Sequence, residues 1–533
     1  MRRKWDVEAV SDYRGSDYTF AEMATEIARL HHTFEKLGIQ PGDKIAIAAK
    51  NSAHWAISFL AASTYRAVVV PILNDFTPEA ITSLVDHSES VVLFTEEKTW
   101  QEMEQEKMPQ LRATFDIDRF AALHSTDGKL AEHIESAHVK YPTTIPAAER
   151  EAATDYQIGS LDELVIINYT SGTTSTPKGV MLTAENISTN IEFALETIPV
   201  HDGDNLMSML PLAHMYGMAF EFLYPLCGGA HVYFLGKTPT PTLLMQALAD
   251  IKPYLLITVP LVMEKIFKNK VMPALNKPLP RLLTSVPFLR KLVYGKVRRQ
   301  LIATFGGRLR EIILGGAAIS RPVERIMKRV KLPYTVGYGM TECGPLIGYA
   351  HWETFRLRSC GRPVTGVDVR IDSAKPHSIA GEIQVKGTNV MQGYYKNPEA
   401  TAAAFTADGY LRTGDLGIID RRCNIFIKGR SKCMILTANG QNIYPEEIES
   451  IINSMENITE SLVVERNKHL EALVTLTTEA QELSDQEIAT MLEGIRQELN
   501  QRLPAYSQIV AFEHMKEGFE HTPKQSIKRF LYK

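Results

Sequence analysis

The amino-acid sequence predicts an α/β protein: a large N-terminal domain of mixed, mainly parallel sheets with helices, and a small α+β C-terminal domain. Two observations predict this class. Strand-like and helix-like segments alternate near the start of the chain, and a linker-like stretch precedes the last hundred or so residues. The length of 533 residues is also several times that of an average domain of roughly 100 to 200 residues. We therefore expect two domains, residues 1–429 and 430–533.

The alternation is clearest in residues 44–95. The second helix of this segment has three start signals, with Thr77 as its N-cap, Pro78 at its first position and Glu79 in its first turn. Strands separated by helices in this way imply a mostly parallel sheet covered by helices. The predicted elements are a strand at 44–49, a helix after Ser52, a strand at 67–72, the second helix, and a strand at 91–95.

Four further strands are predicted in the N-terminal domain, and most of them run straight into glycine-rich or threonine-rich turns. Ligands bind at such strand ends in sheets of this kind. These strands span residues 164–169, 255–259, 311–314 and 333–336.

The C-terminal domain follows a hairpin-like stretch at 417–427 and the sequence IKGRSK at 427–432. One of its helices should open at Pro445, with two glutamates in the first turn. Another should follow the capping box Ser484–Glu487, because apolar residues then recur on one helical face.

Composition limits the possible class of protein and its cellular compartment. The chain has 58 basic and 62 acidic side chains, so no basic field favours a nucleic-acid partner. Its five scattered cysteines suit a reducing cytosol. The first residues, MRRKWDVEAVSDYRG, lack the apolar core of a signal peptide, and no apolar run approaches the ~20 residues that span a bilayer. We expect a cytoplasmic protein.

The segment YTSGTTSTPKGV at 169–180 has the composition of an anion-binding loop. Small residues let backbone N–H groups turn inward, hydroxyl groups add donors, and Lys178 adds a positive charge. The segment follows a predicted strand and precedes a helix that should start near Thr183. The spacing from Gly172 to Lys178 excludes a Walker-type loop. On its own, the segment predicts an anion site and a flexible surface loop about equally.

This segment resembles the signature loop of the adenylate-forming superfamily, which includes acyl-CoA synthetases, luciferases and the adenylation domains of peptide synthetases. Six further segments resemble that family in the same order and at suitable distances. They span nearly the whole chain, and several motifs in register are far more specific than one. The segments are LPLAHMYG (210–217), ILGGAAIS (313–320), GYGMTECGP (337–345), YLRTGDLG (410–417), KGRSKCMILTANGQNIYPEEIE (428–449) and TPKQSIKR (522–529).

The resemblance implies ATP, Mg²⁺ and coenzyme A as ligands, and it assigns residues to them. The backbone at Gly315, Gly316 and Ala317 would let the adenine and the acyl chain approach closely. Tyr338, followed by Gly339, would offer the base an aromatic face. The phosphates of ATP would lie against Thr170, Ser171, Gly172, Thr173, Thr174 and Lys178. Ser175 stands where the family usually has glycine.

The polar remainder of the implied site is spread over three motifs. Thr341 would contact the α-phosphate and Glu342 the Mg²⁺, since a hard cation needs oxygen ligands. Asp415 and Arg430 would hold the ribose hydroxyls. His214 matches a family position near the substrate carboxylate. Each of these residue types also has an ordinary structural role, as a tight turn, a core side chain or a solvated polar group.

The resemblance further implies a mechanism with a moving domain. A catalytic lysine would arrive on the C-terminal domain, which would then swing about a hinge at 429–432 and present Gly440 to the CoA thiol. Lys432 fits the family hinge position. The catalytic lysine is less clear, because Ser526 stands where the long-chain form of the motif has it. Lys524 or Lys528 could reach the same phosphate on a long stem, and we favour Lys524.

The motifs of this sequence resemble those of the long-chain fatty acid branch of the superfamily more than those of the aryl or amino-acid branches. The expected function is therefore an AMP-forming, ATP-dependent acyl-CoA synthetase acting on a long-chain fatty acid. Two alternatives remain: transfer of the acyl group to a carrier-protein thiol, and a non-catalytic nucleotide-binding protein.

The run at 277–299 mixes Leu, Val and Phe with seven basic residues. Such a mixture is typical of a surface that contacts anionic lipid at a membrane, and also of a solvated helix packed on the domain. The packed helix is the favoured interpretation, with peripheral membrane contact as the alternative.

Overall fold

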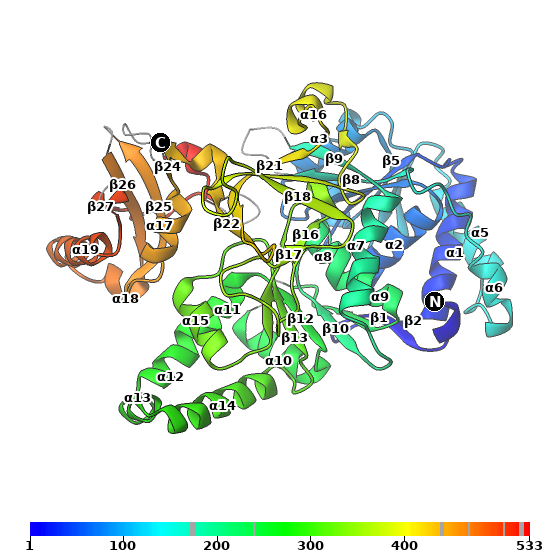
Figure 1. Ribbon diagram of the computed structural model, residues 1–533. Coiled ribbons are helices and arrows are strands. Elements are labelled where there is room, and N and C mark those ends of the chain that lie inside the picture. Colours follow the sequence, from blue (N-terminus) through cyan, green and yellow to red (C-terminus); the bar gives the residue numbers. More distant parts are fainter. Residues whose placement is uncertain are drawn as a thin grey trace.

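The computed structural model describes residues 1–170, 177–237, 240–436, 442–466, 469–504, 507–521 and 527–532. Two large sheets and smaller antiparallel sheets form the N-terminal domain, and a smaller domain lies beside them at the C-terminal end (Figure 1). This confirms the predicted fold class. Within the described ranges, no helix is both long enough and apolar enough to cross a bilayer.

The first large sheet is parallel at its centre. In spatial order its strands are β20 (Gly393–Tyr394), β9 (Lys178–Thr183), β8 (Leu164–Thr170), β4 (Val68–Ile72), β3 (Lys44–Ala48), β5 (Ser90–Thr95), β6 (Ala113–Asp116) and β7 (Ala121–Ser125). Pairing is parallel from β8 through β6, and it is antiparallel where β20, β9 and β7 join. The strands predicted within residues 44–95 are thus confirmed.

Helices cover both faces of this sheet. They are α1 (Phe20–Lys36), α2 (Ala53–Thr64), α3 (Pro78–Ser88), α4 (Glu97–Glu102), α5 (Leu130–Lys140), α6 (Arg150–Ala153) and α7 (Ala184–Thr197). In β3, Ile45 and Ile47 belong to the core cluster that contains Phe34 of α1. Ala46 and Ala48 belong to the cluster on the other face. Alternate residues therefore reach opposite faces, as in a strand buried on both sides.

The second large sheet carries the loops that form the cavity described below. In spatial order its strands are β14 (Tyr334–Val336), β13 (Glu311–Leu314), β12 (Leu255–Thr258), β10 (Asn205–Ser208), β11 (His231–Phe234), β1 (Glu8–Asp12) and β2 (Asp17–Thr19). Pairing is parallel from β14 through β1, so the carboxyl ends of these strands meet at one edge. The helices that follow these strands are α8 (Met215–Gly217), η4 (Met218–Leu223), α9 (Tyr224–Gly228), α10 (Pro241–Ile251), α11 (Pro260–Ile266), η5 (Phe267–Val271), α12 (Met272–Asn276), α13 (Pro278–Ser285), α14 (Pro287–Thr304) and α15 (Arg321–Arg329).

Two antiparallel sheets complete the N-terminal domain. One contains β15 (Tyr338–Gly339), β16 (Leu346–Tyr349) and β17 (Arg362–Pro363). The other contains β18 (Val367–Asp372), β19 (Gly381–Gly387), β21 (Leu411–Ile419) and β22 (Ile425–Arg430), and α16 (Pro398–Ala404) lies between its strands in the sequence. The predicted hairpin at 417–427 is the β21–β22 pair.

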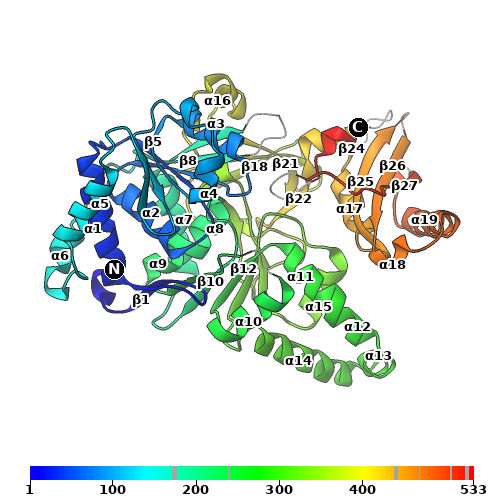
Figure 2. The same cartoon turned by 180° about the vertical axis from the view of Figure 1, so that it is seen from behind.

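The C-terminal domain has its own hydrophobic core. Its elements are β23 (Ile435–Leu436), β24 (Asn442–Ile443), α17 (Pro445–Ile452), β25 (Ile458–Arg466), β26 (His469–Leu476), α18 (Thr478–Gln481), α19 (Asp485–Asn500) and β27 (Ile509–His514). One core cluster contains only residues from this part of the described chain, including Ile452, Val474 and Leu499. The predicted helix starts at Pro445 and at the Ser484 capping box are confirmed. Figure 2 shows this domain from behind, with α17 toward the N-terminal domain.

One strand was not predicted. The last residues of the segment 169–180 belong to β9, which pairs with β8 and precedes α7. Helix α7 does begin where predicted, after Thr183, whose side chain accepts the backbone N–H of Asn186. The apolar run of β9 is too short for its periodicity to distinguish a strand from the start of a helix.

Candidate active site

A cavity of about 2870 Å³ lies at the edge where the parallel strands of the second sheet end, and residues of both domains line it. Typical ligand pockets hold roughly 300–1,000 Å³, so this one has room for several ligands at once. Its walls include the segments that directly follow β10, β12 and β13, and Thr170 at the end of β8. The sequence predicted a ligand site at the strand ends, and the structure has a cavity there.

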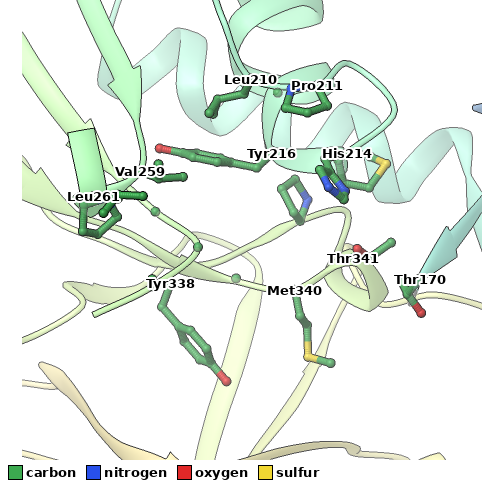
Figure 3. Close-up of a pocket in the computed structure, with 18 of the residues that line it drawn as sticks. Thr170, Leu210, Pro211, His214, Tyr216, Val259, Leu261, Tyr338, Met340 and Thr341 are labelled. Atoms are coloured by element: carbon green, nitrogen blue, oxygen red, sulfur yellow. The ribbon is translucent and has the colours of Figure 1, made fainter. Parts of the chain in front are cut away.

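One end of the cavity is lined by hydrocarbon and aromatic side chains. In the view of Figure 3, Val259 and Leu261 lie on one side, Thr170 and Thr341 lie on the other, and His214 lies between them. A ligand that fills the cavity would therefore meet apolar groups at one end and hydroxyl groups at the other. The apolar lining includes Phe193, Tyr216, Phe220, Leu244, Val259 and Leu261.

Gly315 and Gly316 make a close backbone approach at the end of β13. A Cβ atom at Gly315 would lie 2.7 Å from Cζ of Tyr216, so a larger residue would collide with that ring. The Tyr216 hydroxyl donates to the carbonyl of Ile313 (3.1 Å), which holds the ring across the glycine. Gly316 has a φ of +82°, a conformation that favours glycine. Ala317 follows them on the cavity wall.

His214 is held on a loop that follows β10. The loop is anchored by two asparagines from the first sheet region: Asn51 donates to the carbonyl of Leu210 (2.7 Å), and Asn168 donates to the carbonyl of Ala213 (2.7 Å). The backbone N–H of His214 donates to the carbonyl of Pro211 (3.0 Å) and thereby closes the turn. The two large sheets thus jointly place His214 on the cavity wall.

A buried carboxyl group holds the start of the same loop. Glu221 lies in η4, a π-helical stretch, and its Oε2 accepts three hydrogen bonds: from the Ser208 hydroxyl (3.1 Å) and from the backbone N–H groups of Met209 (3.0 Å) and Leu210 (2.9 Å). Oε1 of Glu221 has no hydrogen-bond partner in the described part of the chain. Burial raises the pKa of Glu221 well above its ordinary value. The sequence does contain a signal, a single acid within the apolar run MAFEFLYPL, that the motif analysis missed.

For the acid that the sequence resemblance implies as substrate, we expect Glu221→Ala to lower kcat/KM by roughly tenfold, since even a 1 Å displacement of a positioning loop can cost up to about 10²-fold. The reason is that three donors of the loop that carries His214 would lose their acceptor. Steady-state kinetics with varied acid measures this effect. Glu221→Gln keeps an acceptor oxygen and should recover most of the loss. Equal activity of Glu221→Ala and the wild type would contradict the positioning role.

The polar end of the cavity brings together three groups that are far apart in the sequence. The Lys178 ammonium lies 4.8 Å from the centre of the Tyr394 ring, and the Tyr394 hydroxyl donates to Oε1 of Glu342 (3.0 Å). Burial, and then the charge of Glu342, raises the pKa of Tyr394, which therefore stays a donor. Lys178 pairs with Thr170 across the β8–β9 hairpin. The motif analysis missed Tyr394, which lies outside the segments quoted above.

Thr341 and Glu342 lie in a short 3-10 helix, Thr341–Cys343, that α7 holds in place. The Asn190 side chain of α7 donates to the carbonyl of Cys343 (3.2 Å) and accepts the N–H of Leu346 (2.8 Å). Asn190 is buried, so this clamp is shielded from water. Gly339, one residue beyond Tyr338 in β15, also lines the cavity.

Tyr338, Asp415 and Arg430 form a connected polar group. The Tyr338 hydroxyl donates to Oδ2 of Asp415 (2.7 Å), and Nε of Arg430 lies 2.8 Å from Oδ1. Burial raises the pKa of Asp415, and the Arg430 guanidinium opposes that shift. An ionised carboxylate has about four acceptor positions, so each oxygen retains one for a further donor. Tyr338 and Arg430 line the cavity.

The C-terminal domain supplies the remaining wall. Lys432 lies in the 3-10 helix Ser431–Cys433, directly after β22, and lines the cavity. Lys528 also lines it, and its Nζ lies 3.1 Å from Oε2 of Glu520. Arg529 forms an ion pair with the buried Glu449. The remaining predicted site residues lie outside the described residues: Ser171, Gly172, Thr173, Thr174, Gly440 and Lys524.

Solved structures share this architecture. The anthranilate CoA ligase AuaEII in complex with anthranoyl-AMP matches with a TM-score of 0.80 at 17% identity, covering 99% of this chain and 94% of that chain. The O-succinylbenzoate coenzyme A synthetase MenE from Bacillus subtilis, in complex with ATP and magnesium ion, matches with a TM-score of 0.75 at 21% identity, covering 98% of this chain and 96% of that chain. The fold is therefore that of the adenylate-forming enzymes.

The chain belongs to the AMP-binding enzyme family. The model of that family matches residues 1–395, and the model of the AMP-binding enzyme C-terminal domain matches residues 433–532. Among characterised relatives, the long-chain-fatty-acid–CoA ligase FadD15 of Mycobacterium bovis is 30% identical over 492 residues, which are 87% of this chain and 78% of that protein.

Proposed function

We propose that this protein is an ATP-dependent acid:CoA ligase that activates a long-chain fatty acid as its acyl-adenylate and transfers the acyl group to CoA. The observation that supports the proposal is one cavity in which a hydrocarbon-lined end, His214 and a polar end with Lys178 are continuous. A fatty acid and ATP placed there would meet at the loop that carries His214.

In the first half-reaction, a carboxylate oxygen of the fatty acid attacks the α-phosphorus of ATP, and the bond from that phosphorus to the pyrophosphate oxygen breaks. Negative charge grows on the phosphoryl oxygens, so preorganised donors stabilise the transition state. Lys178, Thr170 and the segment 171–174 would hold the departing pyrophosphate. Thr341 would hold the α-phosphate, and His214 would face the substrate carboxylate.

The nucleoside part of ATP would lie against the second polar group. Asp415 has free acceptor positions for the two ribose hydroxyls, and Arg430 could donate to the same sugar. The segment Gly315–Ala317 and the Tyr338 ring would border the adenine. We therefore assign the nucleotide to the polar end of the cavity and the acyl chain to the hydrocarbon-lined end.

The residues present fit a bound Mg²⁺ ion. Mg²⁺ is usually held by one or two carboxylates together with substrate phosphates and water, and Glu342 presents a carboxylate on the cavity wall. The described residues contain no cluster of three or more His, Cys, Asp or Glu that could hold a metal without a substrate. When bound, the ion would neutralise charge on the phosphate oxygens.

In the second half-reaction, the CoA thiol sulfur attacks the acyl carbonyl carbon, and AMP leaves. We place the boundary of the moving domain at residue 430, with Lys432 in the hinge at 429–432 and Gly440 beside the path of the thiol. The separate hydrophobic core of the C-terminal domain supports its movement as one unit. Lys524 or Lys528 would approach the phosphate in the first half-reaction.

A long-chain acid is the finer part of the proposal. The FadD15 relative is a long-chain-fatty-acid–CoA ligase, which supports it, whereas AuaEII and MenE act on other acids by their names. The hydrocarbon and aromatic side chains of the cavity favour a substrate with a hydrocarbon tail, because burial of apolar surface is favourable.

The test is the nucleotide product. Purified protein should be incubated with ATP, Mg²⁺ and CoA together with, in turn, acetate, octanoate, palmitate and benzoate, and the nucleotides separated by chromatography. We expect AMP and pyrophosphate, with the highest kcat/KM for palmitate. ADP as the product, or no AMP with any acid, would overturn the proposal. Replacing CoA by a holo-carrier protein tests the alternative acceptor, which a higher rate with the carrier would favour.

A further inference from the structure

The helices α13 and α14 carry positive charge without any balancing acid. The segment 277–304 contains no Asp or Glu. No ion pair within the described part of the chain involves any of its cations, which are Lys277, Arg281, Arg290, Lys291, Lys296, Arg298 and Arg299. Because no acid of the described residues neutralises them, these cations are available to an external anionic partner.

Large apolar side chains are exposed on the same two helices. Leu279 is 65% exposed, Leu282 67%, Phe288 70% and Leu292 58%. Soluble proteins do expose single apolar residues, but a group of four within fourteen consecutive positions marks an interaction site. The favoured sequence interpretation, a solvated helix packed on the domain, does not account for this exposure.

On α14, the exposed apolar side chains lie on one side of the helix, and the opposite side packs against the protein. Tyr294, Val297 and Leu301 pack against the core of the second sheet, so this face is already used. At 100° per residue, Phe288 and Leu292 point away from that face, and so do the cations Lys296 and Arg299, whereas Lys291 lies on its flank. Leucine, phenylalanine and cationic groups are therefore interleaved on the outward face.

The α13–α14 element is continuous with the cavity wall. Leu261 and Ile266 of α11 line the cavity, and the chain then passes through η5 and α12 into α13. Figures 1 and 2 both show α13 and α14 along one outer edge of the N-terminal domain, away from the first large sheet. A partner bound to this edge would be connected through α12 and η5 to the segment that borders the cavity.

We propose that the outward face of α13 and α14 docks on the surface of an anionic lipid bilayer. Cations would bind the lipid phosphates while Leu279, Leu282 and Phe288 enter the boundary between headgroups and acyl chains. An acidic protein could bind the cations, but it would not explain why exposed leucines lie among them. Delivery of fatty acid from that bilayer to the cavity rests on the proposed function, whereas docking itself does not.

Vesicle sedimentation tests this proposal. The full chain, without ATP, fatty acid or CoA, is mixed with vesicles of phosphatidylcholine alone or of phosphatidylcholine with phosphatidylglycerol, and the bound fraction is measured. We expect binding to the anionic vesicles, weaker binding to the neutral ones, and a loss of binding as salt is raised. Each cation near such a surface strengthens binding about fivefold, so Lys296→Gln/Arg299→Gln should weaken it about 25-fold.

Matched variants separate docking from general effects. Phe288→Gln/Leu292→Gln should also weaken vesicle binding, by roughly tenfold or more. The charge control is Arg421→Gln/Arg422→Gln, and the apolar control is Val139→Gln/Leu161→Gln; these four residues are exposed elsewhere on the protein, and both controls should bind as the wild type does. Unchanged thermal unfolding shows that each variant is folded.

Three results would overturn the proposal: no binding of the wild type to anionic vesicles, equal losses in the controls, or wild-type binding by both α14 variants. Self-association of the wild type through this face in analytical ultracentrifugation, without vesicle binding, would identify a second copy of the chain as the partner instead. None of these measurements depends on turnover, so a failure of the proposed ligase activity would be seen separately.

Discussion

Lys524→Ala is expected to lower the rate of ATP–pyrophosphate exchange by about 10²–10³-fold, the usual cost of removing one donor that stabilises a charged transition state. Ser526 stands at the position where the long-chain form of the motif has lysine, so another side chain must supply that charge. A lysine stem is long and flexible enough to tolerate a shift of two residues. Transfer of a preformed acyl-adenylate to CoA should remain near the wild-type rate, because the lysine serves the first half-reaction alone.

Lys528→Ala is the matched control for this prediction. The Lys528 ammonium already lies 3.1 Å from a carboxylate oxygen of Glu520, so it has a partner within its own domain. We expect its loss to change pyrophosphate exchange far less than the loss of Lys524. Wild-type exchange in Lys524→Ala would rule out that assignment, and a selective loss in Lys528→Ala would transfer the role to Lys528.

Asp415→Ala should weaken ATP binding by about a hundredfold or more. Hydrogen bonds to a charged group contribute about 1.5–3 kcal/mol each, and the carboxylate would accept one from each of two ribose hydroxyls. The same change leaves the Tyr338 hydroxyl buried without its acceptor, which should lower the free energy of unfolding by about 1–3 kcal/mol. Calorimetric titration with ATP and chemical denaturation measure the two effects.

Two further variants separate charge from fold. Asp415→Asn retains an acceptor for Tyr338 and should preserve stability better than affinity for ATP. Asp408→Ala removes an exposed carboxylate that pairs with Arg370 beside the same sheet, and we expect it to change neither quantity. A wild-type dissociation constant for ATP in Asp415→Ala would exclude the ribose contact.

Local signals in the sequence were sufficient for the strands and helix starts that were predicted. Thr77 and Ser484 cap helices as predicted, and Ser52 and Thr183 cap the helices that were predicted to begin beside them. A capping side chain bonds to a backbone group only three residues away, so the signal is local. The strands at β3, β4 and β5 follow from runs of apolar residues between turn signals. Strand β9 was missed, since its pairing with β8 depends on a neighbour across a hairpin rather than on its own pattern.

Part of the candidate site could also be predicted. Lys178, Glu342, Asp415 and Arg430 were expected from motifs, and the structure places all four on or beside the cavity wall. Several residues that hold the site were not expected: Tyr394 and Asn190, which contact Lys178 and the Glu342 helix, and Glu221, which holds the loop that carries His214. Each acts through a contact with a residue distant in the chain or on another element, so neither its spacing nor its type signals the role.

By itself, the sequence determined the family, the order of the elements and the chemistry available to the site, since these depend on residue type and on spacing within short segments. The tertiary structure alone decided which distant groups meet. Lys178 and Tyr394 come together because β9 pairs with β20. Only the structure shows which face of α14 points outward, because Tyr294, Val297 and Leu301 pack against the core on the other side. Burial and contact are properties of how sheets and helices pack, and packing depends on strand order, which no local pattern encodes.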